Sequence, residues 1–242
     1  MKIVITGSKG FIGSHLVDAL GEHQIIEWDT KIEKNINNFN LKSTTDIVIH
    51  LAGLIDVRES ILKPDDYWLN NVVYSKKIFN MCNDMKIPLL YASSAAVKEW
   101  YRSPYGATKK VLEEISHDNQ IGLRFETVFG EGSSAFGLYT KIKNKTLTYK
   151  TNHVRDFIHV DDIVDCIKMF IWKKDNFYEF NKVYEIGTGI GYNVSDVVDY
   201  YKLDVPLKEG DVIEIPRSVA NTKLINELGW KAKRNIYNKW KY

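Results

Sequence analysis

The residues best suited to chemistry are Tyr105 and Lys109, four positions apart in the run Tyr-Gly-Ala-Thr-Lys and downstream of the pair Ser93-Ser94. Positions i and i+4 share one face of an α-helix, so the two side chains would be neighbours there. A nearby cation favours the ionised form of a tyrosine and lowers its pKa. The spacing therefore predicts a tyrosine that accepts a proton from an alcohol near neutral pH, with Ser94 close by.

Three glycines near the start of the chain predict a dinucleotide-binding loop. Gly7, Gly10 and Gly13 follow an apolar run of strand length that stops at Thr6, and an amphipathic pattern begins at Phe11. In such a loop the first glycine makes a tight turn, the second admits a pyrophosphate and the third lets the helix pack on the strand. Together with the tyrosine and the lysine, this loop predicts an enzyme that moves hydride.

An acidic residue then predicts which dinucleotide binds. The apolar run at 24–29 ends on Asp29, where a carboxylate is expected to hydrogen-bond the adenosine ribose hydroxyls. A carboxylate repels a 2′-phosphate, so NAD is favoured over NADP. Glycine triplets occur by chance in many chains, and the flanking strand, the helix and Asp29 make this one specific.

Composition sets broad limits. A chain of 242 residues with 44% apolar content suits one large α/β domain, or a dinucleotide domain with a small lobe. A formal charge of +2, without a basic run interleaved with aromatics, does not indicate nucleic acid. Cys82 and Cys166 lie in helix-like stretches and are expected to be buried reduced thiols. No signal peptide or apolar run of membrane length is seen, which predicts a cytoplasmic protein without a membrane partner.

Strand-like and helix-like segments alternate along the chain and predict a doubly wound parallel sheet of the α/β class. The expected strands are 2–6, 24–29, 46–51, 87–92 and 121–125, and the expected helices start at Phe11 or cover 64–85 and 105–118. Open α/β sheets bind ligands at the carboxyl edge of their strands. The residues expected at that edge are Gly7, Asp29, Ala52, Ser94 and Phe125.

Several motifs in the same order resemble those of extended short-chain dehydrogenase/reductases of the nucleotide-sugar epimerase/dehydratase type. The pattern is closest to UDP-glucose 4-epimerases. The motifs are Ala52-Gly53-Leu54, Glu59-Ser60, Asn70-Asn71-Val72, Tyr91-Ala92-Ser93-Ser94, Arg155-Asp156-Phe157-Ile158-His159 and Glu185-Ile186-Gly187-Thr188-Gly189.

The resemblance implies NAD-dependent epimerisation of a nucleoside-diphosphate sugar at C4 through a transient 4-keto intermediate. Tyr105 would be the acid/base on the sugar hydroxyl, Lys109 would hold the tyrosinate and the nicotinamide ribose, and Ser94 would relay the proton. The cofactor-binding residues it implies are Gly7, Gly10, Phe11, Ile12, Gly13, Asp29, Leu51, Ala52, Gly53, Asn71, Tyr105 and Lys109.

A diphosphate brings two negative charges, for which arginine is the preferred bidentate ligand. Arg155 matches the phosphate-contacting arginine of the family, and Arg217 lies in a segment similar to a second diphosphate-binding stretch. The structural alternative for Arg155 is an ion pair with Asp156 or Asp161. The substrate-binding residues implied are Ser94, Thr127, Arg155 and Arg217.

A metal site is not expected, although His159 and Asp161-Asp162 resemble one at first sight. Asp162 is expected to cap a helix that begins at Ile163, with His159 packed beneath it.

Family members commonly pair through the helices near 64–85 and 104–118, so a homodimer is a further expectation from the resemblance.

The chain also departs from the family pattern. Only eleven positions separate Ser94 from Tyr105, Lys98-Glu99 replaces the usual Tyr-Gly, and Thr127 replaces an asparagine. Ile55 stands where 4-epimerases place a cofactor-binding lysine, and the segment before Arg155 is short. We therefore expect an NAD-binding Rossmann domain over 1–128 and a small, reduced substrate lobe over 129–242, interleaved with the last Rossmann elements.

Other functions stay open. A 4,6-dehydratase needs an acid and a base directly after the serine, where this chain has Ala95 and Ala96, and an epimerase/reductase would want a cysteine near Ala96. An NAD-dependent dehydrogenase of a small alcohol would use the same triad without the diphosphate arginines. A non-catalytic NAD-binding regulator is the alternative of another class, favoured by the short loops and disfavoured by the intact triad.

Overall fold

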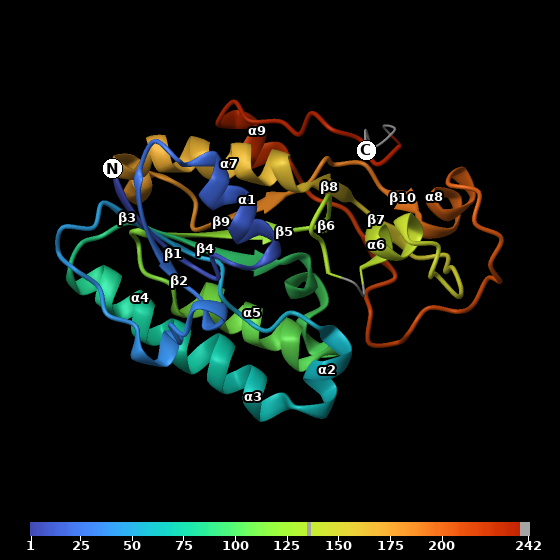
Figure 1. Ribbon diagram of the computed structural model, residues 1–242, viewed down its shortest axis with the longest axis horizontal. Helices are drawn as coiled ribbons and strands as arrows, with labels where there is room; N and C mark the ends of the chain where they lie inside the picture. Colours follow the sequence, from blue (N-terminus) through green and yellow to red (C-terminus); the bar gives the residue numbers. More distant parts are fainter. Residues whose placement is uncertain (135–136, 238–242) are drawn as a thin grey trace.

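A six-stranded parallel sheet with the order β2-β1-β3-β4-β5-β9 forms the centre of the computed structural model, which describes residues 1–134 and 137–237 (Figure 1). The strands are β1 Lys2–Thr6, β2 Gln24–Trp28, β3 Ile47–His50, β4 Leu89–Ser94, β5 Gln120–Phe125 and β9 Val183–Ile186. The strand order reverses between β1 and β3, where open α/β sheets form a ligand crevice. The predicted doubly wound sheet is confirmed, and the predicted strand bounds differ by at most two residues.

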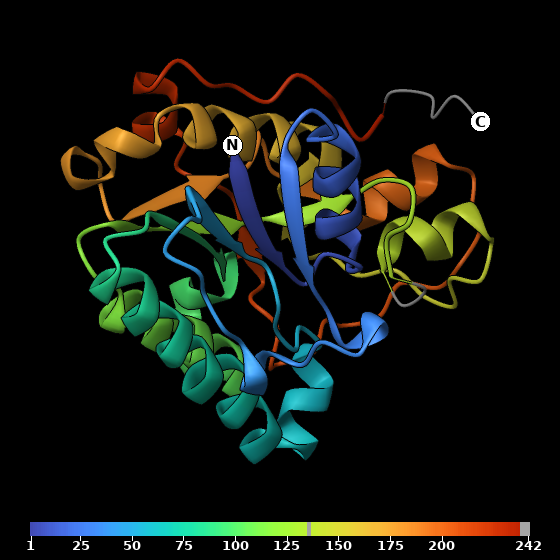
Figure 2. The same cartoon turned by 60° about the vertical axis from the view of Figure 1, so that its left-hand side comes forward.

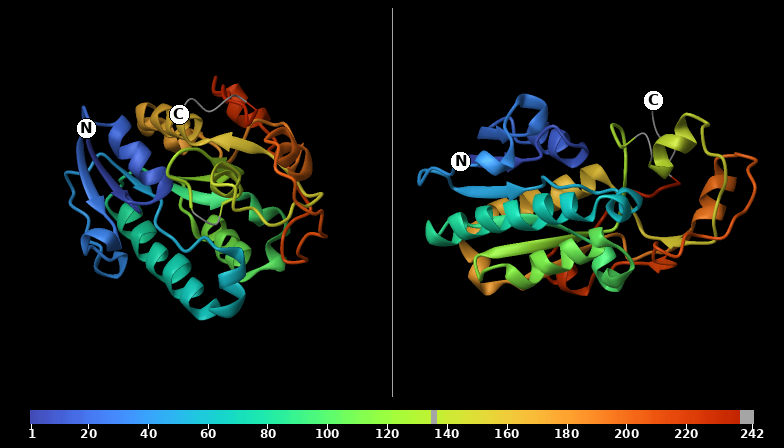
Figure 3. Two further views of the ribbon diagram at one scale, coloured as in Figure 1. Left: turned by 45° about the vertical axis from the view of Figure 1, so that its right-hand side comes forward. Right: turned by 90° about the horizontal axis from the view of Figure 1, so that it is seen from below.

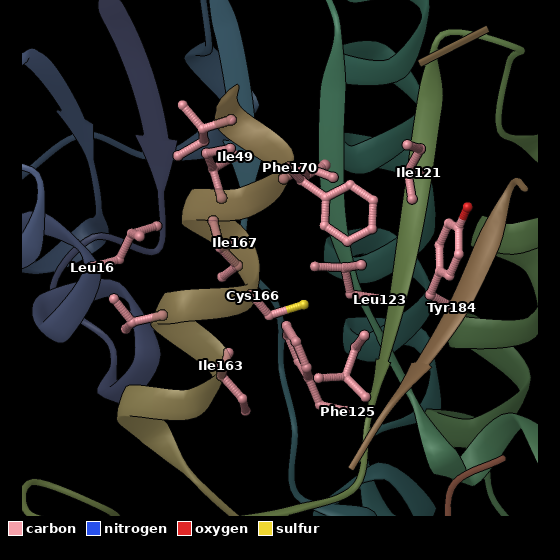
Figure 4. Close-up of a cluster of buried hydrophobic side chains, with 14 of the residues drawn as sticks. Leu16, Ile49, Ile121, Leu123, Phe125, Ile163, Cys166, Ile167, Phe170 and Tyr184 are labelled. Carbon is pink, nitrogen blue, oxygen red and sulfur yellow. The ribbon is translucent and has the colours of Figure 1, made fainter. Parts of the chain in front are cut away.

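Helices cover both faces of this sheet (Figure 2). One face carries α1 Phe11–Ala19 and α7 Val160–Trp172, and the other carries α4 Ser75–Asp84 and α5 Pro104–Ile115. Figure 4 shows the face that carries α1 and α7. There Leu16 of α1 and Ile167 and Phe170 of α7 belong to one core cluster with residues of the main sheet such as Ile49 and Leu123. Because the central strands contact helices on both faces, β1 and β3 carry apolar runs at 3–5 and 47–49.

The helix predicted over 64–85 contains a change of winding. It comprises α3 Pro64–Trp68, the π-helical turn η3 Leu69–Tyr74, and α4. Pro64 occupies the first turn, as predicted. Asn71 lies within the π turn, and such turns occur often at functional sites.

The remaining elements are short. They are η1 Thr30–Ile32, η2 Ile36–Asn38, α2 Val57–Leu62, η4 Ala95–Arg102, β6 Thr127–Phe129, α6 Leu138–Lys143, β7 Val154–Arg155, β8 Phe157–His159, η5 Lys174–Glu179, β10 Tyr192–Asn193, α8 Val194–Tyr200, β11 Arg217–Ser218 and α9 Lys223–Glu227. The strands form the small sheets β10-β7-β11 and β6-β8. Together with α6 and α8 they lie at one end of the main sheet, around a separate apolar cluster that includes Phe129, Tyr139 and Val197 (Figure 3).

The start of α7 corrects one expectation. This helix begins at Val160 instead of Ile163, and its N-cap is His159, whose Nδ1 accepts from the Asp161 amide at 3.2 Å. Asp162 instead accepts hydrogen bonds from the backbone and side chain of Arg234. The carboxylate therefore anchors the C-terminal stretch and does not cap the helix.

The two cysteines are both buried free thiols, as predicted. No helix among the described residues is long and apolar enough to cross a membrane.

Candidate active site

The glycine loop has the close backbone contacts that its sequence predicts. Gly7 has φ +71°, and a Cβ on it would lie 2.7 Å from the Ala52 nitrogen. A Cβ on Gly13 would lie only 2.0 Å from the Gly7 oxygen, so α1 crosses β1 at a distance that only glycine allows. Gly10 is the N-cap of α1 and has no side chain to cap it, which leaves the first helical amides for an anion. These features fit the pyrophosphate of a dinucleotide.

Asp29 is fixed beside this loop at the end of β2. Its Oδ2 accepts from the Lys9 amide and its Oδ1 accepts from the Lys31 amide, both at 2.9 Å. Each carboxylate oxygen has further lone pairs for ribose hydroxyls. Of the two predicted residues at the start of α1, Ile12 packs against the main core and Phe11 lies edge-on to His15.

A second group of predicted cofactor residues meets after β3. A Cβ on Gly53 would lie 3.2 Å from Asn71 Oδ1 and 3.6 Å from Lys109 Nζ. Asn71 accepts from the Leu54 amide at 2.8 Å and donates to the Leu54 carbonyl at 2.9 Å. Its amide therefore fixes the loop that follows β3, while Leu51 and Ala52 border Gly7.

Ser94 and Tyr105 are brought together by the end of β4 and the start of α5. The Ser103 hydroxyl caps α5 by accepting from the Gly106 amide at 3.1 Å, and Pro104 occupies the first turn, so the helix places Tyr105 toward the sheet. Both side chains line one cavity, where the Ser94 hydroxyl also accepts from the Ala96 amide at 3.2 Å. Burial raises the pKa of Tyr105, and the nearby Ser94 hydroxyl opposes this rise.

Lys109 lies one turn further along α5 and is buried. Its Nζ donates to the Ala92 carbonyl at 2.8 Å and lies 5.9 Å from the centroid of the Tyr105 ring. Burial lowers the pKa of Lys109 to about 8. In the chain alone desolvation of the hydroxyl dominates the pKa of Tyr105, so the lowering effect expected from this lysine stays a prediction.

A cavity of about 210 Å³ opens at the carboxyl ends of β4 and β5. Four predicted residues, Ser94, Tyr105, Thr127 and Arg155, line this cavity. β6 pairs with β8 so that Thr127 lies opposite Phe157, and Arg155 enters from the adjacent β7.

Arg217 is not among the cavity-lining residues. Side chains alternate along β11, so Ser218 lines the cavity and Arg217 is exposed. The assignment of Arg217 to the substrate stays a prediction that the cavity does not support.

The guanidinium of Arg155 has partners that the sequence did not indicate. Its Nη1 donates to the Ile215 carbonyl at 2.7 Å, and its Nη2 lies 3.2 Å from Glu214 Oε2. Neither Asp156 nor Asp161, the partners considered in the structural alternative for Arg155, supplies this contact. Burial lowers the pKa of Arg155 and Glu214 opposes that effect.

A buried carboxylate in the same cavity was missed by the sequence analysis. Glu126 accepts from Lys98 Nζ at 2.7 Å and from the Ser218 hydroxyl at 2.6 Å. Burial raises the pKa of Glu126, and the bond from Lys98 opposes the rise. The departure at Lys98 was the available signal, since a lysine that replaces a tyrosine near a buried site needs an anionic partner.

Comparison with known proteins agrees with this geometry. The profile of the NAD dependent epimerase/dehydratase family matches residues 3–187. The UDP-glucose 4-epimerase of Yersinia enterocolitica is 27% identical over an alignment of 322 positions, gaps included. This alignment covers 98% of this chain and 94% of that protein. A putative UDP-glucose 4-epimerase of Methanocaldococcus jannaschii is 28% identical over 289 residues, with 95% and 92% covered.

The fold is shared with solved structures as well. MoeE5, solved with UDP-glucose and NAD, has a TM-score of 0.87 at 23% identity and covers 98% of this chain and 95% of its own. TunA, an NAD-dependent NDP-hexosamine 5,6-dehydratase, has a TM-score of 0.85 at 23% identity and covers 98% and 94%. The family profile, which spans more than half of the chain, together with the glycine loop shows that the chain belongs to the NAD dependent epimerase/dehydratase family.

Proposed function

We propose that this protein is an NAD-dependent epimerase that inverts C4 of a nucleoside-diphosphate sugar through a transient 4-keto intermediate. The observation that carries the proposal is the placement of Ser94 and Tyr105 in one cavity with Arg155. The pair can exchange a proton with a sugar hydroxyl, and the arginine can hold a phosphate. Relatives named UDP-glucose 4-epimerase that match nearly the whole chain support the same assignment.

In this proposal the chain's own groups move the proton. Tyr105 must first lose its own proton to solvent, against the desolvation that raises its pKa. As the tyrosinate it accepts the proton of the 4-hydroxyl, either directly or through Ser94, and returns it in the second half of the reaction. Lys109, with a pKa of about 8, is mainly protonated at neutral pH and supplies a buried cation near the tyrosine ring. Bound NAD supplies the acceptor for the hydride that leaves C4.

Two cavity-lining methyl groups favour epimerisation over dehydration. Ala95 and Ala96 directly follow Ser94 and line the cavity. Expulsion of a hydroxyl from C6 requires a general acid and a general base in those positions, and a methyl group can be neither.

The reaction can be followed by NMR of the sugar anomeric protons. The protein is incubated with NAD and, in separate samples, UDP-glucose, UDP-N-acetylglucosamine and the corresponding GDP sugars. We expect a C4 epimer to appear without steady growth of absorbance near 340 nm, because the cofactor is regenerated in each cycle. Linear NADH production with a small alcohol would instead show a dehydrogenase, and NAD binding without any turnover would show a regulator.

Tyr105→Phe tests the proton transfer itself. The change keeps the ring and removes the hydroxyl, so turnover should fall roughly 100-fold or more while NAD affinity is kept. Tyr101→Phe, at an exposed tyrosine outside the cavity, is the matched control and should be silent. Near-normal turnover by Tyr105→Phe would show that another group carries the proton.

A further inference from the structure

Three of the six arginines in the chain contact one short segment, residues 211–215, which we call the strap. Arg58 reaches it from α2, Arg102 from the end of η4, and Arg155 from β7. Three strap residues line the cavity that holds Ser94 and Tyr105, namely Ile213, Glu214 and Ile215. Arginines from three separate elements thus converge on one wall of the candidate active site.

Glu214 is the centre of this convergence. Its Oε1 lies 2.6 Å from Arg58 Nη2, and its Oε2 lies 3.2 Å from Arg155 Nη2. One carboxylate therefore bridges two guanidinium groups. Since guanidinium forks bind carboxylates and phosphates with the same geometry, the position of this carboxylate marks where both arginines can hold an anion.

The charges that line the cavity are paired before any ligand enters. Among the described lining residues the cations are Arg102 and Arg155, and the structure pairs them with Glu99 and Glu214. Glu126, the remaining lining carboxylate, is paired with Lys98. A diphosphate that entered beside Arg155 would meet Glu214 at the same guanidinium, and two anions compete for one cation.

The strap is tied to the rest of the molecule mainly through side chains of the three arginines and of His153, whose Nδ1 lies 3.4 Å from Glu214 Oε2. The amides of Ile213 and Glu214 bond to Asp211, which is itself part of the strap. Arg102 Nη1 holds the Val212 carbonyl at 2.6 Å, and the Val212 side chain is exposed. Release of these contacts would move the strap without breaking a strand or a helix.

We propose that Arg58 and Arg155 together bind the diphosphate of the substrate, and that Glu214 occupies this site until the diphosphate displaces it. This inference rests on the proposed function, since that function supplies the diphosphate. Arg58 does not itself line the cavity and contacts its wall through Glu214, and in this proposal it becomes a substrate-binding residue. Glu214 is an internal competitor that sets how strongly an anion must bind in order to open the strap.

Isothermal titration with inorganic pyrophosphate measures this competition on the full chain loaded with NAD. Glu214→Gln keeps the shape and removes the charge, so pyrophosphate should bind roughly tenfold more tightly than to the unchanged protein. Arg58→Gln should weaken binding, and the double variant should lose the gain of Glu214→Gln. Glu209→Gln removes one exposed carboxylate just before the strap and should leave the affinity unchanged. An unchanged or weaker affinity of Glu214→Gln would overturn the proposal.

Hydrogen exchange on the unchanged protein gives a second readout that needs no variant. Pyrophosphate should speed amide exchange at residues 211–215, because displacement of Glu214 frees the strap. Slower or unchanged exchange there would contradict the displacement even if the variants fail to fold.

The two proposals can fail separately. Tighter pyrophosphate binding by Glu214→Gln without turnover of any nucleotide sugar would contradict the proposed function and support the anion site. Turnover of a nucleotide sugar by the unchanged protein, with an unchanged pyrophosphate affinity of Glu214→Gln, would support the proposed function and contradict the displacement of Glu214.

Discussion

Burial shifts the two titratable groups of the candidate triad in opposite directions. It raises the pKa of Tyr105 and lowers that of Lys109 to about 8, because a low-dielectric site disfavours the charged form of each. The same effect lowers the pKa of His50 to about 3, and this neutral ring bonds to Thr6 at 2.6 Å and Ser75 at 2.8 Å. The site thus holds a neutral tyrosine beside a buried cation that costs folding free energy.

Lys109→Met should separate function from stability. The folded pKa of Lys109 lies below the usual 10.5, so the unfolded chain binds more protons between pH 8 and 10.5, and the free energy of unfolding rises with pH in that window. Below pH 8 the buried charged amine lowers the free energy of unfolding by its full cost, about 3 kcal/mol for a pKa shift of this size. The methionine variant removes this cost but also loses the hydrogen bond to Ala92, which reduces the gain. The cofactor-free variant should therefore be about 1–3 kcal/mol more stable at pH 7 in urea denaturation, although turnover falls.

That gain should shrink at pH 10, where the buried amine of the unchanged protein is already neutral. Lys110→Met, at the neighbouring surface lysine paired with Glu114, should change stability little at either pH. A variant at Lys109 that is less stable than the parent at pH 7 would show that the hydrogen bond to Ala92 outweighs desolvation.

At the scale of elements, close crossings determine where the cofactor groups lie. α1 packs so tightly on β1 that Gly13 meets the Gly7 carbonyl, and the π turn η3 places Asn71 against the loop after β3. Both contacts are made by elements that also fill the core, since Leu16 of α1 and Val72 of η3 are buried. The packing of helices on the sheet therefore also holds the cofactor loop in position.

Gly13→Ala tests this crossing. The added methyl would lie 2.0 Å from the Gly7 oxygen, so α1 must shift away from β1, and overpacking of this kind costs about 1–3 kcal/mol. Urea denaturation and NAD titration should both show a loss. Gly21→Ala follows the same helix, and its nearest contact is at 3.8 Å, so it should change neither quantity. Equal behaviour of the two variants would refute the role given to the crossing.

For the whole molecule, one buried carboxylate joins segments that are far apart in sequence. Asp156, between β7 and β8, accepts from the Thr188 amide and hydroxyl, the Gly189 amide and the Ala220 amide at 2.7–3.2 Å. It therefore ties the small sheets to the turn after β9 and to the C-terminal stretch. A Cβ on Gly187 would lie 2.4 Å from its Oδ2, which explains a glycine in the second motif of this region.

Asp156→Asn should loosen this junction. An asparagine has one acceptor oxygen and one NH2 group, so at least two of the four donors lose their acceptor, at a cost of about 3 kcal/mol or more. We expect a lower midpoint in urea denaturation and a lower melting temperature. Asp175→Asn, on the exposed surface of η5, removes the same charge and should be close to neutral. Stability equal to that of the parent would show that the junction does not depend on this charge.

The homodimer expected from the resemblance stays a prediction at this scale. Exposed apolar side chains do gather on α3 and η3, where Trp68, Leu69 and Val73 are among the exposed large residues. Sedimentation of the purified protein would measure whether a second copy covers them.

The sequence alone determined the features that depend on local spacing. The glycine loop, the alternation of strands and helices, and the placement of Tyr105 in one cavity with Ser94 follow from short runs whose geometry is set by turn and helix periods. The tertiary structure decided which charged groups meet. Arg155 turns to Glu214, and the register of β11 brings Ser218 into the cavity while Arg217 stays outside. These contacts join positions about sixty or more apart, and desolvation of Tyr105 depends on packing from several elements, so no local pattern could have specified them.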